Sequence, residues 1–258
     1  MLATLTRAAL TAAILAMTIN ICQAAAIGAQ DANAPVQKDG NIRPLTPYSA
    51  QYTTKTRGMS LTLNRQLKQD EEGNYTLTNG GKILVFGFHE VSVFTVDSDR
   101  ITPRSYVYQG TGLVNRRREV HFTQGSEVIR SLYKKEWYEL PYSPGTLDRM
   151  SQMEQLRLML INDPTPKEDV VLRIADGKRI KDYQLVYLGE ETLQTPMGPV
   201  DTLHFERLHD DADRKSDTWI APSWDYLMVR TVHIEDGRPV EVNLVSADIN
   251  GQTLTSAE

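Results

Sequence analysis

Apolar and polar residues alternate with a period of two along most of this chain, and no other pattern restricts its fold as strongly. In the clearest example, Met59, Leu61 and Leu63 alternate with Ser60 and Thr62. Successive side chains of a strand point to opposite faces of a sheet, so this alternation indicates a half-buried β-strand. Further candidate strands follow at roughly ten-residue spacing, punctuated by Gly and Asp turns, which is typical of antiparallel sheets. They are residues 75–77, 82–96, 104–109, 118–122, 127–132, 136–140, 170–175, 181–188, 201–207, 217–221, 226–233 and 240–245.

One segment, residues 146–162, has a helical period instead. Its apolar residues recur at three- and four-residue steps, at Leu147, Met150, Met153, Leu156 and Leu160. Thr146 or Asp148 can cap its start, and Pro164 ends it. The fold class that we predict is mainly β: a curved antiparallel sheet or half-open β-barrel wrapping one central α-helix.

The first residues have the three-part pattern of a secretory signal peptide. Arg7 is the only charged residue before Asp31, and the apolar stretch from Ala8 to Ile21 has 14 residues, short of the roughly 20 that span a bilayer. Small residues follow, so we expect cleavage after Ala24, with Ala26 as the second choice, and a periplasmic location. Cys22 could instead carry a lipid, but the bulky Ile21 before it disfavours a lipoprotein.

The expected organisation is a signal peptide at 1–24, a disordered tether at 25–46, a single β-barrel-like domain at 47–250 and a C-terminal tail at 251–258. Cys22 is the only cysteine, so its loss with the signal peptide excludes thiol catalysis and cysteine-ligated zinc. The net charge of −5 becomes −6 without Arg7, which disfavours general nucleic-acid binding. No later segment is apolar enough to be a transmembrane segment of the mature protein.

Catalytic and cofactor motifs are missing from the sequence. The five histidines form no HExxH pattern, there is no Gly-x-Ser-x-Gly nucleophile elbow, and no glycine-rich loop precedes a helix. Asp148 and Ser151 could be catalytic, although a helix cap explains their spacing. We therefore expect no catalytic residues, no metal and no cofactor.

Candidate ligand-binding residues come from the basic cluster, the aromatic residues and the methionines. In Arg116-Arg117-Arg118, alternation puts Arg116 and Arg118 on one face, where they could clamp phosphate or carboxylate groups; the alternative is a solvated strand edge. Trp and Tyr side chains can line a groove or fill a core, and methionine adapts to varied apolar shapes. The residues that we single out are Trp137, Tyr138, Met150, Met153, Trp219, Arg116 and Arg118.

The order of several short motifs resembles domain-of-unknown-function family 3108. These motifs are Glu139-Leu140-Pro141 followed by Asp148, Ser151 and Gln155-Leu156-Arg157; then Gly189-Glu190-Glu191 with Thr195-Pro196 and Gly198; then Trp219-Ile220-Ala221-Pro222 before Tyr226-Leu227. Met228 stands where the family usually has proline. The resemblance implies an exported Gram-negative envelope protein with a half-barrel similar to the LolA/LolB lipoprotein carriers. It implies no catalytic residues, and we interpret Asp148, Ser151 and Arg157 as a helix cap and a helix-to-sheet ion pair.

These observations favour a non-enzymatic periplasmic binding or carrier protein. Its ligand would be an apolar or lipidic molecule, or a segment of an envelope protein, held between sheet and helix. One alternative is a structural or assembly factor of the cell envelope that acts through protein–protein contacts. A second is a cell-wall-directed hydrolase, which predicts paired carboxylates or a Ser–His pair in an open cleft.

Overall fold

The computed structural model describes residues 42–254, apart from 57–58, 84–85, 113–114 and 236. The predicted signal peptide and nearly all of the predicted tether therefore lie outside the described residues. The first eight strands are β1 (Tyr48–Thr56), β2 (Met59–Gln69), β3 (Tyr75–Ile83), β4 (Phe86–Asp97), β5 (Arg100–Gly112), β6 (Arg117–Phe122), β7 (Val128–Tyr133) and β8 (Glu136–Pro141). The other elements are β9 (Thr146–Leu147), α1 (Ser151–Asn162), β10 (Asp169–Asp176), β11 (Arg179–Thr195), β12 (Gly198–Arg207), β13 (Lys215–Ala221), the 3-10 helix η1 (Pro222–Trp224), β14 (Leu227–Glu235), β15 (Arg238–Ile249) and β16 (Gln252–Thr253).

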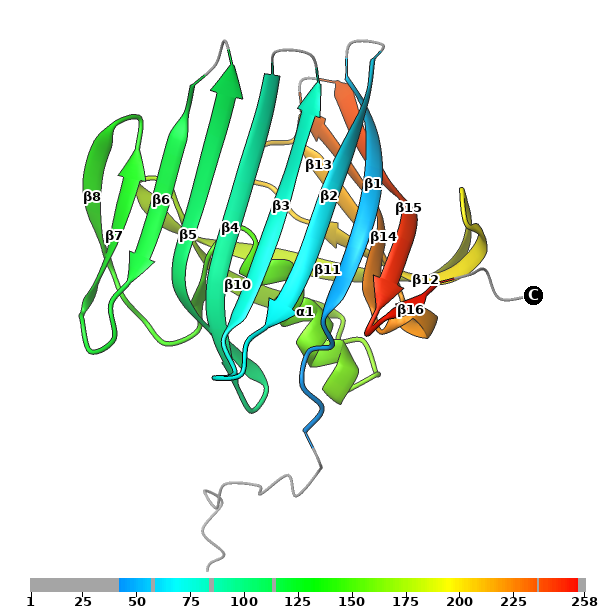
Figure 1. The fold of residues 1–258 in the computed structure, drawn as a ribbon, viewed down its shortest axis with the longest axis horizontal. Helices are drawn as coiled ribbons and strands as arrows, with labels where there is room; N and C mark the ends of the chain where they lie inside the picture. The colour runs from blue at the N-terminus through cyan, green and yellow to red at the C-terminus, as the bar shows by residue number, and fades with distance from the viewer. Residues whose placement is uncertain (1–41, 57–58, 84–85, 113–114, 236, 255–258) are drawn as a thin grey trace, which may run out of the picture. The chain divides into compact units, whose positions relative to one another are not determined.

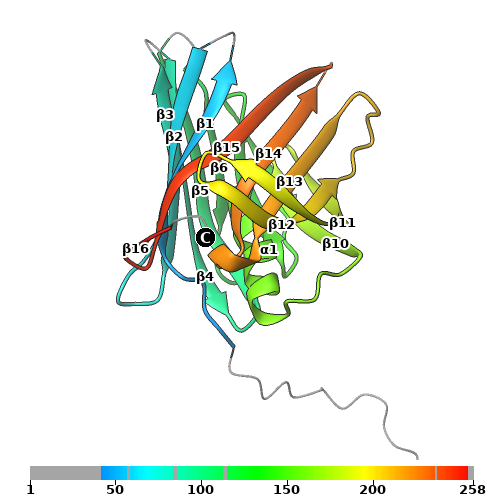
Figure 2. The ribbon, with the colours of Figure 1, turned by 90° about the vertical axis from the view of Figure 1, so that its right-hand side faces the viewer.

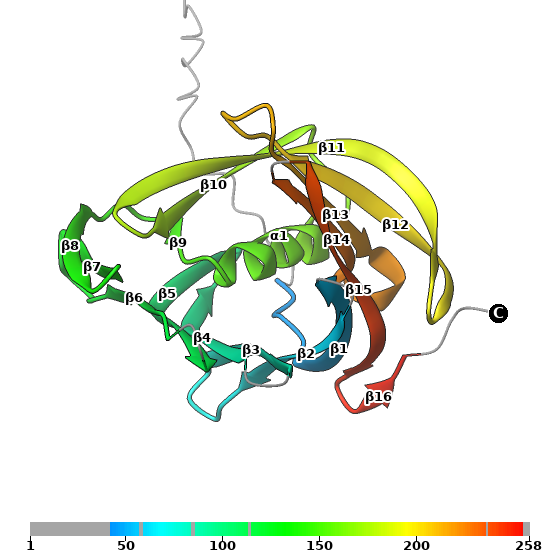
Figure 3. The ribbon, with the colours of Figure 1, turned by 90° about the horizontal axis from the view of Figure 1, so that it is seen from above.

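All the strands belong to one curled sheet that surrounds the helix. Its order runs from β8 through β7, β6, β5, β4, β3, β2 and β1 to β15, and then from β14 down to β9, with β16 added beside β15. Every pairing is antiparallel except that of β9 with β10. Figure 1 shows the strands from β8 to β1 in front of α1, and Figure 3 shows the sheet curling around the helix. The predicted half-open β-barrel around one central helix is confirmed.

The two ends of the sheet, β8 and β9, do not pair with each other. They are joined instead by side-chain contacts across the seam. The buried Ser131 Oγ on β7 donates a hydrogen bond to the Gly177 carbonyl in the β10–β11 turn, at 2.6 Å. A Cβ on Gly177, which has φ +65°, would lie 3.2 Å from the Tyr133 ring, so the backbone of this turn packs directly on β7.

Several element boundaries differ from those that the sequence predicts. The predicted strand 82–96 spans the end of β3 and most of β4. Strand β1 was not predicted, although it joins β2 to β15 and so connects the two halves of the sheet. The predicted tail contains β16, which pairs with β15. The packed unit also begins before Pro47, because Leu45 is buried and its carbonyl accepts a hydrogen bond from Tyr75 Oη.

The helix begins at Ser151, five residues later than predicted, because Thr146 and Leu147 form β9. Asp148 is the residue that caps it: its Oδ1 accepts the amide hydrogens of Met150 and Ser151, and its Oδ2 accepts from Ser92 Oγ at 2.7 Å. Burial raises the pKa of this carboxyl despite those hydrogen bonds. In Figure 2 the helix lies between the two sides of the curled sheet, and its buried residues are on all faces rather than on one stripe. The described residues include no helix long and apolar enough to cross a membrane.

A buried carboxylate fixes the helix inside the sheet. The side chain of Glu154 is 2% exposed and accepts hydrogen bonds from Tyr48 Oη on β1 at 2.7 Å, from Arg65 Nη2 on β2 at 3.1 Å and from Arg157 Nη1 at 3.4 Å. Arg157 also lies over the Tyr48 ring, 5.0 Å from its centroid. Buried charges are tolerated when they are paired and hydrogen-bonded, and each charge here has such partners.

The same arginine reaches the turn after η1. Arg157 Nε donates to the Asp225 carbonyl at 2.8 Å, and Nη2 pairs with Asp225 Oδ2 at 2.5 Å. Asp225 and Tyr226 both have positive φ, 51° and 57°, a conformation that costs non-glycine residues on the order of 1 kcal/mol. Two of the motifs that suggested the family therefore meet here, and Arg157 forms the predicted ion pair between the helix and the sheet.

We predict that Glu154→Gln lowers the free energy of unfolding by about 3 kcal/mol or more, because it leaves the largely buried Arg65 without its carboxylate and removes one of the two carboxylates that pair with Arg157. The matched control is Asp182→Asn, which breaks an ion pair with Arg173 in which both side chains are 49% exposed. This control should lower the free energy of unfolding by about 1 kcal/mol or less. Urea unfolding followed by circular dichroism measures both values. Equal losses in the two variants would contradict a stabilising role of the buried network.

Candidate ligand-binding cavity

Two adjoining cavities lie beside strands β5–β7. The larger, about 1370 Å³, is lined by the end of β5, the start of β6 and the β7–β8 turn. The smaller, about 780 Å³, reaches from β6 and β7 across to β10–β12 and the segment before α1. Arg118 and Tyr133 line both cavities. The volume of the smaller cavity is usual for small-molecule sites, and that of the larger cavity exceeds the usual range.

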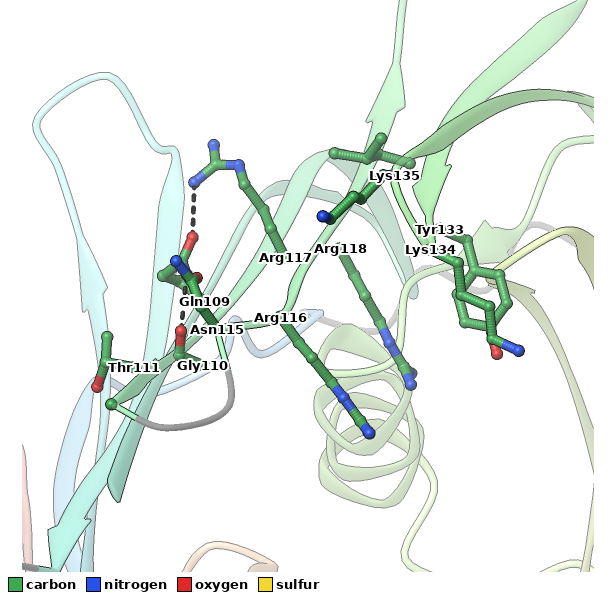
Figure 4. A pocket seen from close by; sticks show the side chains of 12 residues that line it. Gln109, Gly110, Thr111, Asn115, Arg116, Arg117, Arg118, Tyr133, Lys134 and Lys135 are labelled. Carbon is green, nitrogen blue, oxygen red and sulfur yellow. Dashed lines mark hydrogen bonds between the residues drawn. The ribbon is translucent and has the colours of Figure 1, made fainter. Parts of the chain in front are cut away.

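Alternation along β6 divides the predicted arginine cluster as expected. Arg116 and Arg118 extend together on the side of the helix, whereas Arg117 extends the other way toward Gln109 (Figure 4). The Arg118 guanidinium lies 5.2 Å from the centroid of the Tyr133 ring. Arg117 is held outside by Glu119 Oε1, at 2.5 Å. Of the three, Arg116 and Arg118 therefore extend toward the inside of the sheet, and Arg117 contributes to the lining of the larger cavity from the other side.

The smaller cavity is strongly cationic. The described residues that line it include seven arginines and lysines and a single carboxylate, Asp176. Arg149 Nη1 lies 3.3 Å from Asp176 Oδ1, and Lys181 Nζ lies 2.6 Å from Oδ2. Burial raises the pKa of Asp176, but its contacts with Lys181 and Arg149 outweigh burial and hold that pKa below its ordinary value. The only carboxylate of the lining is thus already shared by two cations.

A row of polar side chains crosses β12, β13 and β14 at this cavity. Arg207 pairs in register with Ser216, and Ser216 with His233. Arg207 Nη2 donates to His209 Nδ1 at 3.1 Å. The neutral His209 ring therefore carries its hydrogen on Nε2, and this Nε2 lies 2.8 Å from Ser216 Oγ. Ser216 Oγ in turn lies 2.7 Å from His233 Nδ1. Burial, with the charge of Arg207 and the neighbouring His233, lowers the pKa of His209 to about 4.

The aromatic residues that we singled out are not gathered at the cavities. Trp219 lies on the face opposite Ser216, stacked on His204 at a centroid distance of 4.3 Å, and its indole nitrogen donates to Glu191. Trp137 is 48% exposed on the edge strand β8. Tyr138 is half-buried on the opposite face of that strand and donates to Glu136.

The predicted methionines belong to the packing of the helix. Met150 is buried in the core, and Met153 is half-buried against it. Of the residues predicted to bind ligand, the structure places Arg116 and Arg118 at the cavities. Among the described residues, no group of three or more His, Cys, Asp or Glu side chains could hold a metal ion.

Sequence analysis missed most of the residues that line the smaller cavity. Three of them are charged residues that extend an apolar face of their strand: Arg207 follows Phe205 on β12, Lys181 precedes Tyr183 on β11, and Asp176 follows Ile174 on β10. A charge at an inward position was therefore the available signal, because such charges are rare unless paired or functional. That signal does not show which of these charges face one another.

Comparison with known proteins places the chain among β-barrel-like proteins of unknown function. A family described as a protein of unknown function, DUF3108, matches residues 45–242. The chain is also similar to the crystal structure of a β-barrel-like protein of domain of unknown function DUF1849 from Brucella abortus. The TM-score is 0.51 at 13% identity, over 80% of this chain and 98% of that one, which shows a shared fold alone. No curated protein matches the chain.

We predict a pH dependence of stability from His209. Its pKa in the folded state, about 4, lies below its ordinary value of 6.5, so between these values the unfolded chain binds a proton that the folded protein does not. The free energy of unfolding should therefore fall as the pH is lowered from about 6.5 to 4. His209→Gln keeps an acceptor for Arg207 and a donor for Ser216, and should reduce this fall in urea titrations at several pH values. An identical pH profile in the variant would show that His209 titrates normally in the folded protein.

Proposed function

The chain belongs to the DUF3108 family, and we propose that it is an exported, non-enzymatic binding or carrier protein that holds a lipid-like ligand inside its open barrel. The observation that carries this proposal is the pair of adjoining cavities that share Arg118 and Tyr133. The export part rests on the signal-peptide pattern of residues 1–24, which predicts the periplasm.

The surroundings of the cavities suit an amphipathic ligand. Phe88 on β4 and Tyr108 on β5 stack with centroids 6.1 Å apart and are half-buried against the core. Tyr108 pairs in register with Arg118 on β6, so an aromatic surface adjoins a cationic one. A ligand with an apolar body and a polar head is complementary to such a boundary.

Packing around the helix restricts where the ligand lies. Leu156, Leu158 and Leu160 are buried, and Gln155 accepts from the Ile101 amide and donates to the Asp99 carbonyl. A pocket of about 420 Å³ beside Gln155 and Met159 is smaller than either cavity beside β5–β7, so we place the ligand in those two cavities.

We predict that the protein purified from its native host carries an extractable lipid, which native mass spectrometry detects. Lys134 and Lys135 line the larger cavity and are exposed, so bound ligand should slow their acetylation, and extraction of the ligand should restore it. The exposed Lys68 and Lys167 lie outside the described cavity linings and serve as controls whose acetylation stays constant. A protein that carries no lipid, and whose lysines react equally before and after addition of host lipid extract, would contradict the proposal.

The assembly-factor alternative is favoured by one observation. Edge strand β8 pairs with no described strand on its outer side, and Trp137 is exposed on it beneath the Arg130 guanidinium, 4.8 Å from the ring centroid. Exposed aromatics and free strand edges are common features of protein-binding surfaces. Under our proposal Trp137→Ala leaves the amount of bound lipid unchanged, whereas an assembly factor would lose a crosslinked envelope partner in this variant.

The hydrolase alternative has a specific feature in Ser216, whose hydroxyl lies within hydrogen-bond distance of both His209 and His233. A serine activated for nucleophilic attack needs such a base. We predict that a fluorophosphonate probe, which labels activated serines, does not modify Ser216, as measured by mass spectrometry of the intact protein with Ser216→Ala as the reference. Stoichiometric labelling that Ser216→Ala abolishes would overturn the non-enzymatic part of the proposal.

A further inference from the structure

Arg207 is half-buried, and its partners differ from those of the arginines around Glu154. Its Nε is buried and has no hydrogen-bond partner among the described residues. Its guanidinium lies over the Tyr183 ring, 3.9 Å from the centroid, and its hydrogen bond goes to the neutral imidazole of His209. The pKa of Arg207 is lowered by burial and also by the charge of Arg149.

Arg157, in the same barrel, is an arginine whose partners explain it as part of the structure. Its side chain is 3% exposed, and it pairs with the carboxylates of Glu154 and Asp225. Arg65 likewise pairs with Glu154. Arg207 forms no such pair with a described carboxylate, because the nearby Asp176 is held by Arg149 and Lys181. Taking a cation partly out of water without a carboxylate is unfavourable, so the pairing that accounts for Arg157 does not account for Arg207.

Further cations converge on the same space from the other side of the barrel. Arg118 on β6 lines the smaller cavity together with Arg149, Lys181 and Arg207, and its described contact is with the Tyr133 ring and not with a carboxylate. The whole chain has a net charge of −5, so this excess of positive charge is local to the cavity. Low-dielectric walls strengthen the attraction of such a cluster for an anion.

We propose that the smaller cavity is a binding site for a phosphoryl group, contacted by Arg118 and Arg207 from opposite walls, with Arg149 and Lys181 beside them. The planar fork of an arginine matches phosphate oxygens with two parallel hydrogen bonds. A phosphoryl group carries up to two negative charges and several acceptor oxygens, which suits more than one cation. This inference rests on the proposed binding function and adds the chemical class of the ligand's polar end.

The test is calorimetric titration of the full-length protein with two probes. Inorganic pyrophosphate represents a soluble phosphoryl compound, and phosphatidic acid in uncharged detergent micelles represents a phospholipid head; diacylglycerol in the same micelles is the phosphate-free control. We expect one binding event per chain for at least one phosphorylated probe, with a dissociation constant that rises with salt. Much tighter binding of phosphatidic acid identifies a phospholipid as the source, and equal binding identifies the phosphoryl group alone.

The variants are Arg207→Met, Arg207→Lys, Arg118→Met and the control Arg173→Met. Arg207→Met and Arg118→Met should each weaken binding by a factor of about ten or more, and Arg207→Lys by less, because it keeps the charge but loses the fork. Arg173→Met removes an arginine paired with Asp182, outside the described lining of this cavity, and should bind like wild type. Arg118→Met keeps the test valid if Arg207→Met fails to fold.

Two results would overturn the inference: no binding of either phosphorylated probe at millimolar concentration, or unchanged binding in both Arg118→Met and Arg207→Met. Either result leaves the carrier proposal standing if an unphosphorylated lipid is extracted from the purified protein. Conversely, phosphoryl binding that depends on Arg118 and Arg207, in a protein that carries no lipid, supports the site and contradicts the carrier.

Discussion

The buried carboxylate of Glu154 is the interaction on which the rest of this structure depends. A helix inside a curled sheet would normally be held by apolar packing, and this one has Leu156, Leu158 and Ile161 for that purpose. The hydrophobic effect is not directional, whereas a carboxylate shared by Tyr48 on β1, Arg65 on β2 and Arg157 on the helix specifies one orientation of the helix. Arg157 extends this constraint to Asp225, so the first strands, the helix and the β13–β14 turn are positioned together.

The interior of the barrel therefore contains two kinds of charge with different consequences. Around Glu154 each cation is paired with a carboxylate, and these pairs hold the helix in one position relative to the strands. Around Arg207 the cations outnumber the carboxylates, and the result is a region whose electrostatic energy falls when an anion enters. The rigid part orients the strands that carry the cationic part, because β12 and β13 are connected to the helix through η1 and Asp225.

Much of the fold could be predicted from the sequence because its determinants are local. The period of two specifies strands such as 59–67, and the three- and four-residue steps specify the helix. The predicted start of the helix is too early, because the apolar Leu147 continues the helical pattern although it belongs to β9. Strand β1 was missed because its residues, YSAQYTTKT, are mostly polar or small. The candidate site was harder to predict, because Arg118, Lys181 and Arg207 lie on three separate strands and meet only when the sheet curls. Adjacent arginines on one strand were visible in the sequence, but their partners across the barrel were not.

The unpaired ends of the sheet have a mechanical consequence for the cavity. A barrel closed by a continuous backbone ladder has a fixed circumference, since widening it means breaking a whole row of hydrogen bonds. Here β8 and β9 are not paired, and among the described residues β7 contacts the β10–β11 turn through the Ser131 to Gly177 hydrogen bond and through the Tyr133 ring against Gly177. Tyr133 and Lys181, on either side of that contact, both line the smaller cavity. The width of the barrel beside this cavity is therefore set by side-chain contacts and not by a backbone ladder.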